Sequence, residues 1–302
     1  MRLLVLGGTR FIGDRIVREA LQRGDEVIVV HRGVTEPGDA PGGGNLTHLH
    51  AARTDFSAIS EQVRALRPDA VVDTNAMTRA DADRYPLRGI IDGRDDYEKL
   101  DVEPGYLDRG GTVLRLAAIY GERDPQRREE FILRRVRAGR TRIPVGAGTW
   151  LWTRGYVGDV ASAVLAVLDN PATTAGEIFN VGDLATDTVR DYANRILAAA
   201  GHDAELVTVP DSVLPADLEI TKATSQHFLG DCGKLTRSMD WCPGDAGDGI
   251  IRSVEWHLNN PPDAAPGDFA ADDRALLARG DDPPDPRCAP GKGRDIGRAP
   301  AR

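Results

Sequence analysis

Three glycines near the amino terminus, in the segment GGTRFIG, have the spacing of a phosphate-binding turn. Gly7 and Gly8 directly follow an apolar strand predicted at 3–6, and Gly13 lies in the helix that comes next. Glycines at such a junction let the backbone turn sharply and approach a pyrophosphate at the positive end of the helix. Arg10 stands where such turns commonly hold another glycine. The segment predicts a dinucleotide site, and a plain tight turn of an α/β protein is the alternative.

The second predicted strand, at 26–30, is followed by His31 and Arg32 rather than by the acid that would bind the ribose of NAD. An arginine at this place can pair with the 2′-phosphate of NADP, and Arg10 could reach the same region. We therefore expect NAD(P) as the cofactor, with NADP preferred. An ordinary solvated arginine at the end of a strand is the alternative interpretation of Arg32.

Strands and helices alternate along the first half of the chain, which is typical of a doubly wound sheet. An amphipathic helix follows Thr9 and ends at Gly24. Further strands are predicted over 46–50, 69–73, 112–119 and 178–181, and further helices over 56–66 and 159–168. We expect an α/β fold with a Rossmann-type doubly wound parallel sheet and a smaller carboxyl-terminal substrate lobe.

The same pattern predicts the division of the chain. A dinucleotide-binding domain should cover 1–125, with 155–182 returning to it, and the substrate lobe should comprise 126–154 and 183–260. Residues 261–302 are rich in proline and aspartate and carry few large apolar side chains. We expect this segment to be disordered, because it buries too little apolar surface to offset its ordering entropy.

Composition narrows the class of function. The formal net charge of −9 over 302 residues makes a nucleic-acid partner unlikely, because such proteins usually carry a basic excess. The three cysteines form no C-x-x-C pair, so we expect free thiols, no metal site and a cytoplasmic location. No apolar run approaches the roughly 20 residues that a membrane span needs, so no membrane partner is expected.

Several segments occur together in one order: GGTRFIG, RPDAVVDTNA, DYEKLDVE, TVLRLAAIYGERD, RGYVGDVASAVLAVL and GEIFNVGD. Over residues 1–260 the chain resembles the extended short-chain dehydrogenase/reductases, the NAD-dependent epimerase/dehydratase family. The resemblance implies a cofactor on the glycine turn, a nucleotide-sugar-like small molecule in the second lobe, and a homodimer. The implied cofactor contacts are Gly7, Gly8, Thr9, Arg10, Phe11, Ile12, Gly13, Arg32, Asn75 and Lys99.

Arginine in place of the middle glycine is similar to an atypical branch of that family, which includes the chloroplast stem-loop-binding proteins. Some members of this branch are associated with RNA, so the fold alone does not fix the function. Two functions follow: an NAD(P)-dependent epimerase, dehydratase or reductase, or a non-catalytic nucleotide- or RNA-binding sensor.

The catalytic pair of the family is altered. Its reaction uses a tyrosine four residues before a lysine, which lowers the pKa of the phenol for proton transfer. No Tyr-x-x-x-Lys occurs in this chain: Lys99 is present, but Asp95 stands in the place of the tyrosine. We expect Asp95, Lys99 and Thr74 as the catalytic candidates and slow turnover. An ordinary ion pair one helical turn apart is the alternative for the first two.

The interval between Asp73 and Asp95 is too short for the crossover helix, fifth strand and substrate loop that the family places there. The fifth-strand region therefore looks shortened. Either 112–119 pairs directly with 69–73, or a gap exposes backbone and apolar side chains.

Three residues near the predicted second lobe are substrate candidates. Arg154 could bind a phosphate, although a surface ion pair would explain it equally well. Trp152 could flank a sugar or base, with core packing as the alternative. The resemblance places Asp159 at the edge of the substrate cleft, while its position before an apolar helix predicts a helix cap.

Overall fold

The computed structural model describes residues 1–34, 43–52, 58–74, 99–224, 226–263 and 267–278; the side chains of 99–102 lie outside this description. A parallel sheet in the order β3-β2-β1-β4 forms the amino-terminal part. Its strands are β1 (Arg2–Leu6), β2 (Glu26–His31), β3 (Leu46–His50) and β4 (Ala70–Asp73). The predicted Rossmann-type sheet is confirmed.

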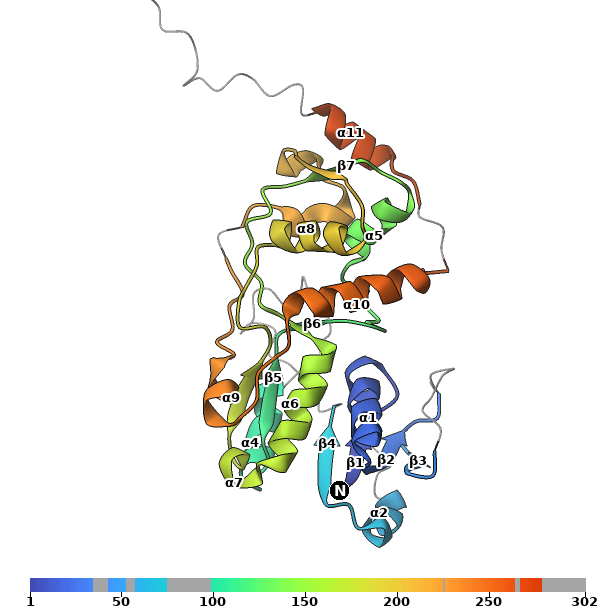
Figure 1. The fold of residues 1–302 in the computed structure, drawn as a ribbon, viewed down its shortest axis with the longest axis vertical. Coiled ribbons are helices and arrows are strands. Elements are labelled where there is room, and N and C mark those ends of the chain that lie inside the picture. The colour runs from blue at the N-terminus through green and yellow to red at the C-terminus, as the bar shows by residue number, and fades with distance from the viewer. Residues whose placement is uncertain (35–42, 53–57, 75–98, 225, 264–266, 279–302) are drawn as a thin grey trace, which may run out of the picture.

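Helices cover both faces of this sheet, which is why β1 and β2 are almost continuously apolar. On one face α1 (Phe11–Arg23) and α6 (Val157–Asp169) lie side by side (Figure 1) and share one apolar cluster with β1 and β2. On the other face α2 (Ser60–Leu66) packs Val63 against Leu4 and Ile28. Gly24, with φ at 92°, ends α1 as predicted.

The single strand predicted over 112–119 is wrong, because the chain changes pairing partner at Ala117. β5 (Val113–Leu116) pairs with β9 (Ile178–Val181), and β6 (Ala118–Tyr120) pairs with β8 (Arg154–Tyr156). The Ala117 amide still donates to Val181 O at 3.0 Å, whereas the Ala118 amide donates to Thr153 O at 3.2 Å.

Of the two predicted outcomes for the short interval, the gap describes the structure. Within the described residues β4 pairs with β1 alone and β5 with β9 alone. Val71 on β4 is 56% exposed and Leu116 on β5 is 37% exposed. These exposed apolar side chains on β4 and β5 are what the predicted gap implies.

The remaining elements follow the sheet. α4 (Lys99–Leu107) precedes β5, and α7 (Pro171–Thr174) precedes β9. The second part, drawn above the sheet in Figure 1, contains α5, α8 and a strand pair, with α10 between it and the sheet. Their bounds are α5 (Glu130–Arg137), β7 (Arg142–Val145), α8 (Val189–Ala199), β10 (Glu205–Thr208), two 3-10 turns (Asp211–Val213 and Ala216–Thr221), α9 (Gly233–Ser238) and α10 (Ala246–Asn259). The domain boundaries given above stay predictions.

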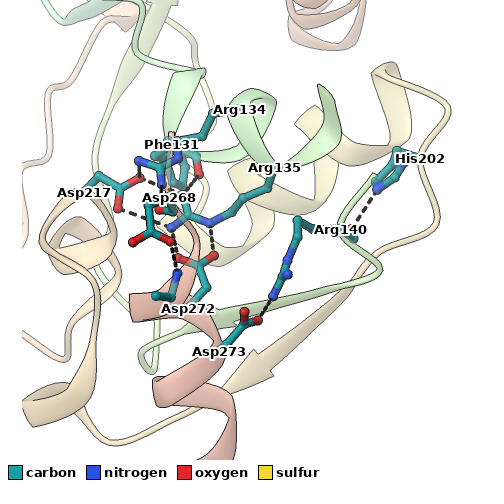
Figure 2. Close-up of polar contacts among 10 residues, drawn as sticks. Phe131, Arg134, Arg135, Arg140, His202, Asp217, Asp268, Asp272 and Asp273 are labelled. Carbon is teal, nitrogen blue, oxygen red and sulfur yellow. Dashed lines mark hydrogen bonds and ion pairs between the residues drawn. The ribbon is translucent and has the colours of Figure 1, made fainter. Parts of the chain in front are cut away.

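The expectation of disorder beyond Asn260 is wrong for 270–278, which form helix α11 (Ala270–Ala278). Figure 2 shows the reason: Arg135 of α5 reaches α11 and forms a two-pronged ion pair with Asp272, at 2.7 and 2.8 Å. Arg135 and Asp272 are 0% and 1% exposed. This buried ion pair joins residues 137 positions apart, so it stabilises a helix that the local composition does not predict.

Among the described residues, no helix has the length and apolar character needed to cross a membrane.

Candidate functional site

The glycine turn has the geometry of a dinucleotide cradle. Gly7 adopts φ of 89°, and its amide donates to Val30 O at 3.0 Å, so the chain leaves β1 and turns sharply into α1. A side chain on Gly13 would place its Cβ 2.2 Å from Gly7 O, and one on Gly8 would lie 2.8 Å from Val17. Glycine at these positions lets the first turn of α1 approach β1 and presents its amides at the surface.

Arginine at position 10 fits this turn without strain. Arg10 is exposed and adopts φ −137°, an extended conformation open to any residue. The next residue, Phe11, has φ of 39°, which is unusual for a residue with a side chain. Arg32 follows β2 and is also exposed. Ile12 and Thr9 are partly buried beside them.

Thr74, expected as a catalytic hydroxyl, serves the turn. Its Oγ1 donates to Leu6 O at 2.8 Å and lies 3.3 Å from Gly7 O, and its amide donates to Leu6 O at 3.1 Å. These bonds tie the end of β4 to the glycine turn. Asn75 and Asp95 lie outside the described residues, and Lys99 begins α4 with its side chain outside the description.

Helix α4 is bonded both to β4 of the four-stranded sheet and to β5 of the β5–β9 pair. The hydroxyl of Tyr106 donates to Asp73 at the end of β4, and Arg115 of β5 binds Glu103 at 2.6 and 2.9 Å. The helix that begins at Lys99 is thus anchored beside the end of β4, although the described strands leave a gap there.

A small hollow, partly open to solvent, is lined by Arg154 and Trp152, two of the residues predicted as substrate candidates. Arg154 is only 7% exposed and donates to Trp152 O at 3.1 Å. Its guanidinium lies 3.9 Å from the Tyr192 ring centroid and 5.5 Å from that of Trp152. Among the described residues no carboxylate lies within ion-pair distance of it. Burial lowers the pKa of Arg154, so the pocket favours an added anion.

The Tyr192 side chain is fixed by hydrogen bonds to buried polar groups. Its hydroxyl donates to Glu129 Oε1 at 3.1 Å, and Ser253 donates to the same oxygen at 2.7 Å. All three side chains are buried. The ring that carries the Arg154 guanidinium is therefore fixed by a polar network rather than by packing alone.

None of the three tyrosines around this region has the lowered pKa that a proton-transferring phenol needs. Burial raises the pKa of Tyr120 and Tyr192, and it raises the pKa of Tyr156 to about 12. The Tyr156 hydroxyl lies 2.8 and 2.9 Å from the two oxygens of Glu122. These phenols therefore stay protonated at neutral pH.

The cap predicted at Asp159 is wrong, because Tyr156 precedes the first residue of α6. Asp159 instead lies in the first turn and accepts the Gly244 amide at 2.9 Å. Trp152 stacks on Trp150, with 4.6 Å between ring centroids and 14° between planes. The Trp152 ring also lies near the Arg154 guanidinium and lines the pocket.

The sequence reasoning missed Asp183, which lines the same pocket with Asp187. Asp183 follows β9, and its amide donates to Arg154 O at 2.7 Å. Burial, followed by the nearby Asp159 carboxylate, raises the pKa of Asp183 to about 7, and Arg154 opposes the shift. Its position just past the carboxyl end of a parallel strand was the available signal, because ligands bind at that edge.

Comparison with known proteins agrees with this geometry. Residues 3–86 and 105–182 match the family model described as NAD dependent epimerase/dehydratase family. The match is interrupted between residues 87 and 104. A relative, the chloroplast stem-loop binding protein of 41 kDa b of Arabidopsis thaliana, is 25% identical, over 91% of this chain and 84% of its own.

Two solved structures share the fold. The UDP-glucose 4-epimerase of Thermotoga maritima, solved with UDP-glucose, is 21% identical with a TM-score of 0.62, over 87% of this chain and all of its own. The dTDP-glucose 4,6-dehydratase of Bacillus anthracis, solved with NAD, is 16% identical with a TM-score of 0.63, over 86% of this chain and 97% of its own. Because the family match covers more than half of the chain and includes the glycine turn, Arg154 and Asp159, this protein belongs to the NAD-dependent epimerase/dehydratase family.

Proposed function

We propose that the protein binds NADP at the glycine turn and a nucleotide-sugar-like ligand in the pocket beside Arg154. The observation that carries the proposal is the closeness of Gly13 to Gly7, where a Cβ would lie 2.2 Å from the Gly7 carbonyl oxygen. That approach leaves room for a pyrophosphate against the amides that begin α1. The bound nicotinamide would supply hydride exchange.

Different residues near the turn would contact different parts of the cofactor. The first-turn amides of Phe11, Ile12 and Gly13 face the pyrophosphate, and Thr74 keeps the turn closed through its bonds to Leu6 and Gly7. Arg10 and Arg32 are exposed, and their charges suit a 2′-phosphate. The solved relatives named above contain NAD or UDP-glucose, so the preference for NADP is specific to this chain's arginines.

In the pocket, Arg154 would hold the ligand phosphate and Trp152 would contact its apolar side. UDP-glucose, present in the structure of the Thermotoga maritima epimerase, is the ligand class we transfer to this chain. Asp95 and Lys99 remain the proposed proton-transfer pair. We propose slow turnover, because a carboxylate stands where the family has a phenol. The cytoplasmic location and the homodimer stay predictions.

The cofactor proposal is tested by calorimetric titration of the full chain with NADP and NAD. We expect NADP to bind more tightly, and Arg32→Ala to lose about tenfold or more of its NADP affinity with little change for NAD, as for the loss of a charge-assisted bond. Arg64→Ala is the matched control, because Arg64 is an exposed arginine of α2. Equal affinities for both nucleotides, or an unchanged preference in Arg32→Ala, would contradict the proposal.

Stem-loop binding is the second candidate function, favoured by the name of the Arabidopsis relative and by the absence of Tyr-x-x-x-Lys. The net charge of −9 opposes it. Addition of a stem-loop RNA during the NADP titration distinguishes the two functions. Tight RNA binding with no nucleotide binding would favour the second candidate.

A further inference from the structure

The pocket beside Arg154 contains two carboxylates in different situations. Asp187 is paired with Arg195 at 3.1 Å. Asp183 has no such partner, since none of the ion pairs within 4.0 Å between described side chains includes its carboxylate. Asp187 is therefore compensated by its neighbour, and Asp183 contributes the negative charge that an entering anion would meet.

Asp183 is fixed close to Arg154 by the backbone. Its amide donates to the Arg154 carbonyl oxygen at 2.7 Å, and the preceding Gly182 is packed so tightly that a Cβ would lie 2.7 Å from the same oxygen. Both side chains line one hollow. An anion bound by the guanidinium therefore lies within the field of the Asp183 carboxyl group.

The charges that surround Asp183 come from every element packed against it. Acidic groups are Asp159 on α6 and Asp187 before α8, and basic groups are Arg154 on β8 and Arg195 on α8. Tyr120 of β6 and the thiol of Cys232 are uncharged neighbours, because burial raises the pKa of both. The two acids and two bases nearly balance, so burial decides that the carboxyl group holds its proton more firmly than usual.

We propose that Asp183 binds a proton from solvent when an anionic ligand binds at Arg154, so that ligand binding and proton uptake are coupled. The inference rests on the proposed function of Arg154. Once protonated, Asp183 no longer repels the phosphate, and its hydroxyl can donate to a ligand oxygen. Asp183 is thus a specificity residue that selects ligands by charge, and the ligand itself is chemically unchanged.

Linkage gives the sign of the effect. Above the pKa of unliganded Asp183 the protein must take up one proton for each ligand, so affinity falls by up to about tenfold for each pH unit. Below that pKa the group is already protonated, and affinity is independent of pH. UDP-glucose is a suitable probe, because both of its phosphates are diesters and stay ionised across this range.

The test is calorimetric titration of the full chain with UDP-glucose, in saturating NADP, from about pH 6 to about pH 8.5. Buffers of different ionisation enthalpy measure the protons taken up. The wild type should take up close to one proton per ligand at the high end, and affinity should fall by roughly tenfold or more across the range. Asp183→Asn, which is permanently neutral, should bind UDP-glucose with the same affinity at both ends.

Asp187→Asn is the matched control, because it removes a carboxylate from the same pocket but one that is already paired. It should keep the pH dependence of the wild type. Binding that does not vary with pH in the wild type, or a dependence that survives in Asp183→Asn, would overturn this inference while the proposed phosphate contact stands. Absence of UDP-glucose binding at every pH would overturn both.

Discussion

Two buried arginines of this protein have opposite surroundings. Arg135 meets Asp272 and Asp217 and also donates to Phe131 O at 2.6 Å, so each of its three nitrogens has an acceptor (Figure 2). Within the described part of the chain, Arg154 has one hydrogen bond, to Trp152 O, and its guanidinium lies near the rings of Trp152 and Tyr192. Both side chains are buried, but only Arg135 forms ion pairs with carboxylates of described residues.

The pKa values follow this difference. Burial opposes the charge of Arg135, but its bonds to Asp217 and Asp272 outweigh burial, and the pKa of Arg135 is raised. For Arg154 burial prevails and the pKa is lowered. A buried guanidinium with every donor satisfied joins two parts of the chain, whereas one with donors to spare is suited to binding an anion.

The largest effect should come from breaking the satisfied pair. Asp272→Asn leaves the Arg135 charge buried with a weaker partner, so the free energy of unfolding should fall by about 3 to 5 kcal/mol. Urea denaturation measures it. The double variant Arg135→Met, Asp272→Leu should lose less, because it removes both charges together.

The neighbouring residue supplies the control. Asp273, which lies on α11 beside Asp272, pairs with Arg140 but is 56% exposed, so Asp273→Asn should change stability by no more than about 1 kcal/mol. Equal losses for Asp272→Asn and Asp273→Asn would show that burial of the Arg135 pair does not determine its contribution.

Arg154 should show the reverse: a small change in stability and a large change in binding. Arg154→Met keeps much of the side-chain length and removes a charge without an acidic partner, so the free energy of unfolding should stay unchanged or rise. Affinity for UDP-glucose should fall about 10- to 100-fold, as for the loss of charge-assisted bonds to phosphate.

Tyr192→Phe distinguishes the ring from its hydroxyl. The variant loses the bond to Glu129 but keeps the face on which the Arg154 guanidinium lies. UDP-glucose affinity should stay within about threefold of the wild type, since the cation–π contact persists. Unchanged affinity in Arg154→Met would contradict the role given to the guanidinium.

The two arginines also mark how far the sequence can predict this structure. The glycine turn, β1, α1 and β2 follow from residues within 2–31, where apolar period and glycine positions agree. Asp272 and Asp159 depend on distant partners instead. Arg135 is 137 positions from Asp272, and Gly244 is 85 positions from Asp159. Local patterns therefore gave disorder for one and a helix cap for the other.

The sequence predicted two residues of the pocket, Arg154 and Trp152, and missed a third, Asp183. Arg154 and Trp152 lie in a segment that resembles the family, so both were identified. Asp183 belongs to an equally recognisable segment, NVGD, but its importance depends on burial beside Asp159 and on the lack of a counterion, neither of which spacing reveals.

A pH-dependent effect concerns the network behind Arg154, at His257. This buried side chain donates from Nε2 to Gly121 O at 3.2 Å, which leaves Nδ1 to accept a proton, and Nδ1 has no hydrogen-bond partner in the described structure. Burial, followed by the charge of Arg127, lowers the pKa of His257 to about 4. Its neighbour Glu129 is shifted the other way, because burial raises the pKa of that carboxyl group.

A lowered histidine pKa means that the unfolded chain binds the proton more readily, so the His257 contribution is present above about pH 6.5 and is lost as pH falls toward 4. The contribution of Glu129 has the opposite dependence, because it falls as pH rises. The effect of His257 is therefore measured as the difference in unfolding free energy between the wild type and a His257 variant.

His257→Gln keeps a donor for Gly121 O and cannot titrate. Between about pH 6.5 and about pH 5 it should lose about 1 to 2 kcal/mol less than the wild type in urea denaturation. His202→Gln is the control, because His202 also lies 2.9 Å from a backbone oxygen, that of Arg140, but outside this cluster. A wild-type pH dependence in His257→Gln would show that the pKa of this imidazole is the same in the folded and unfolded states.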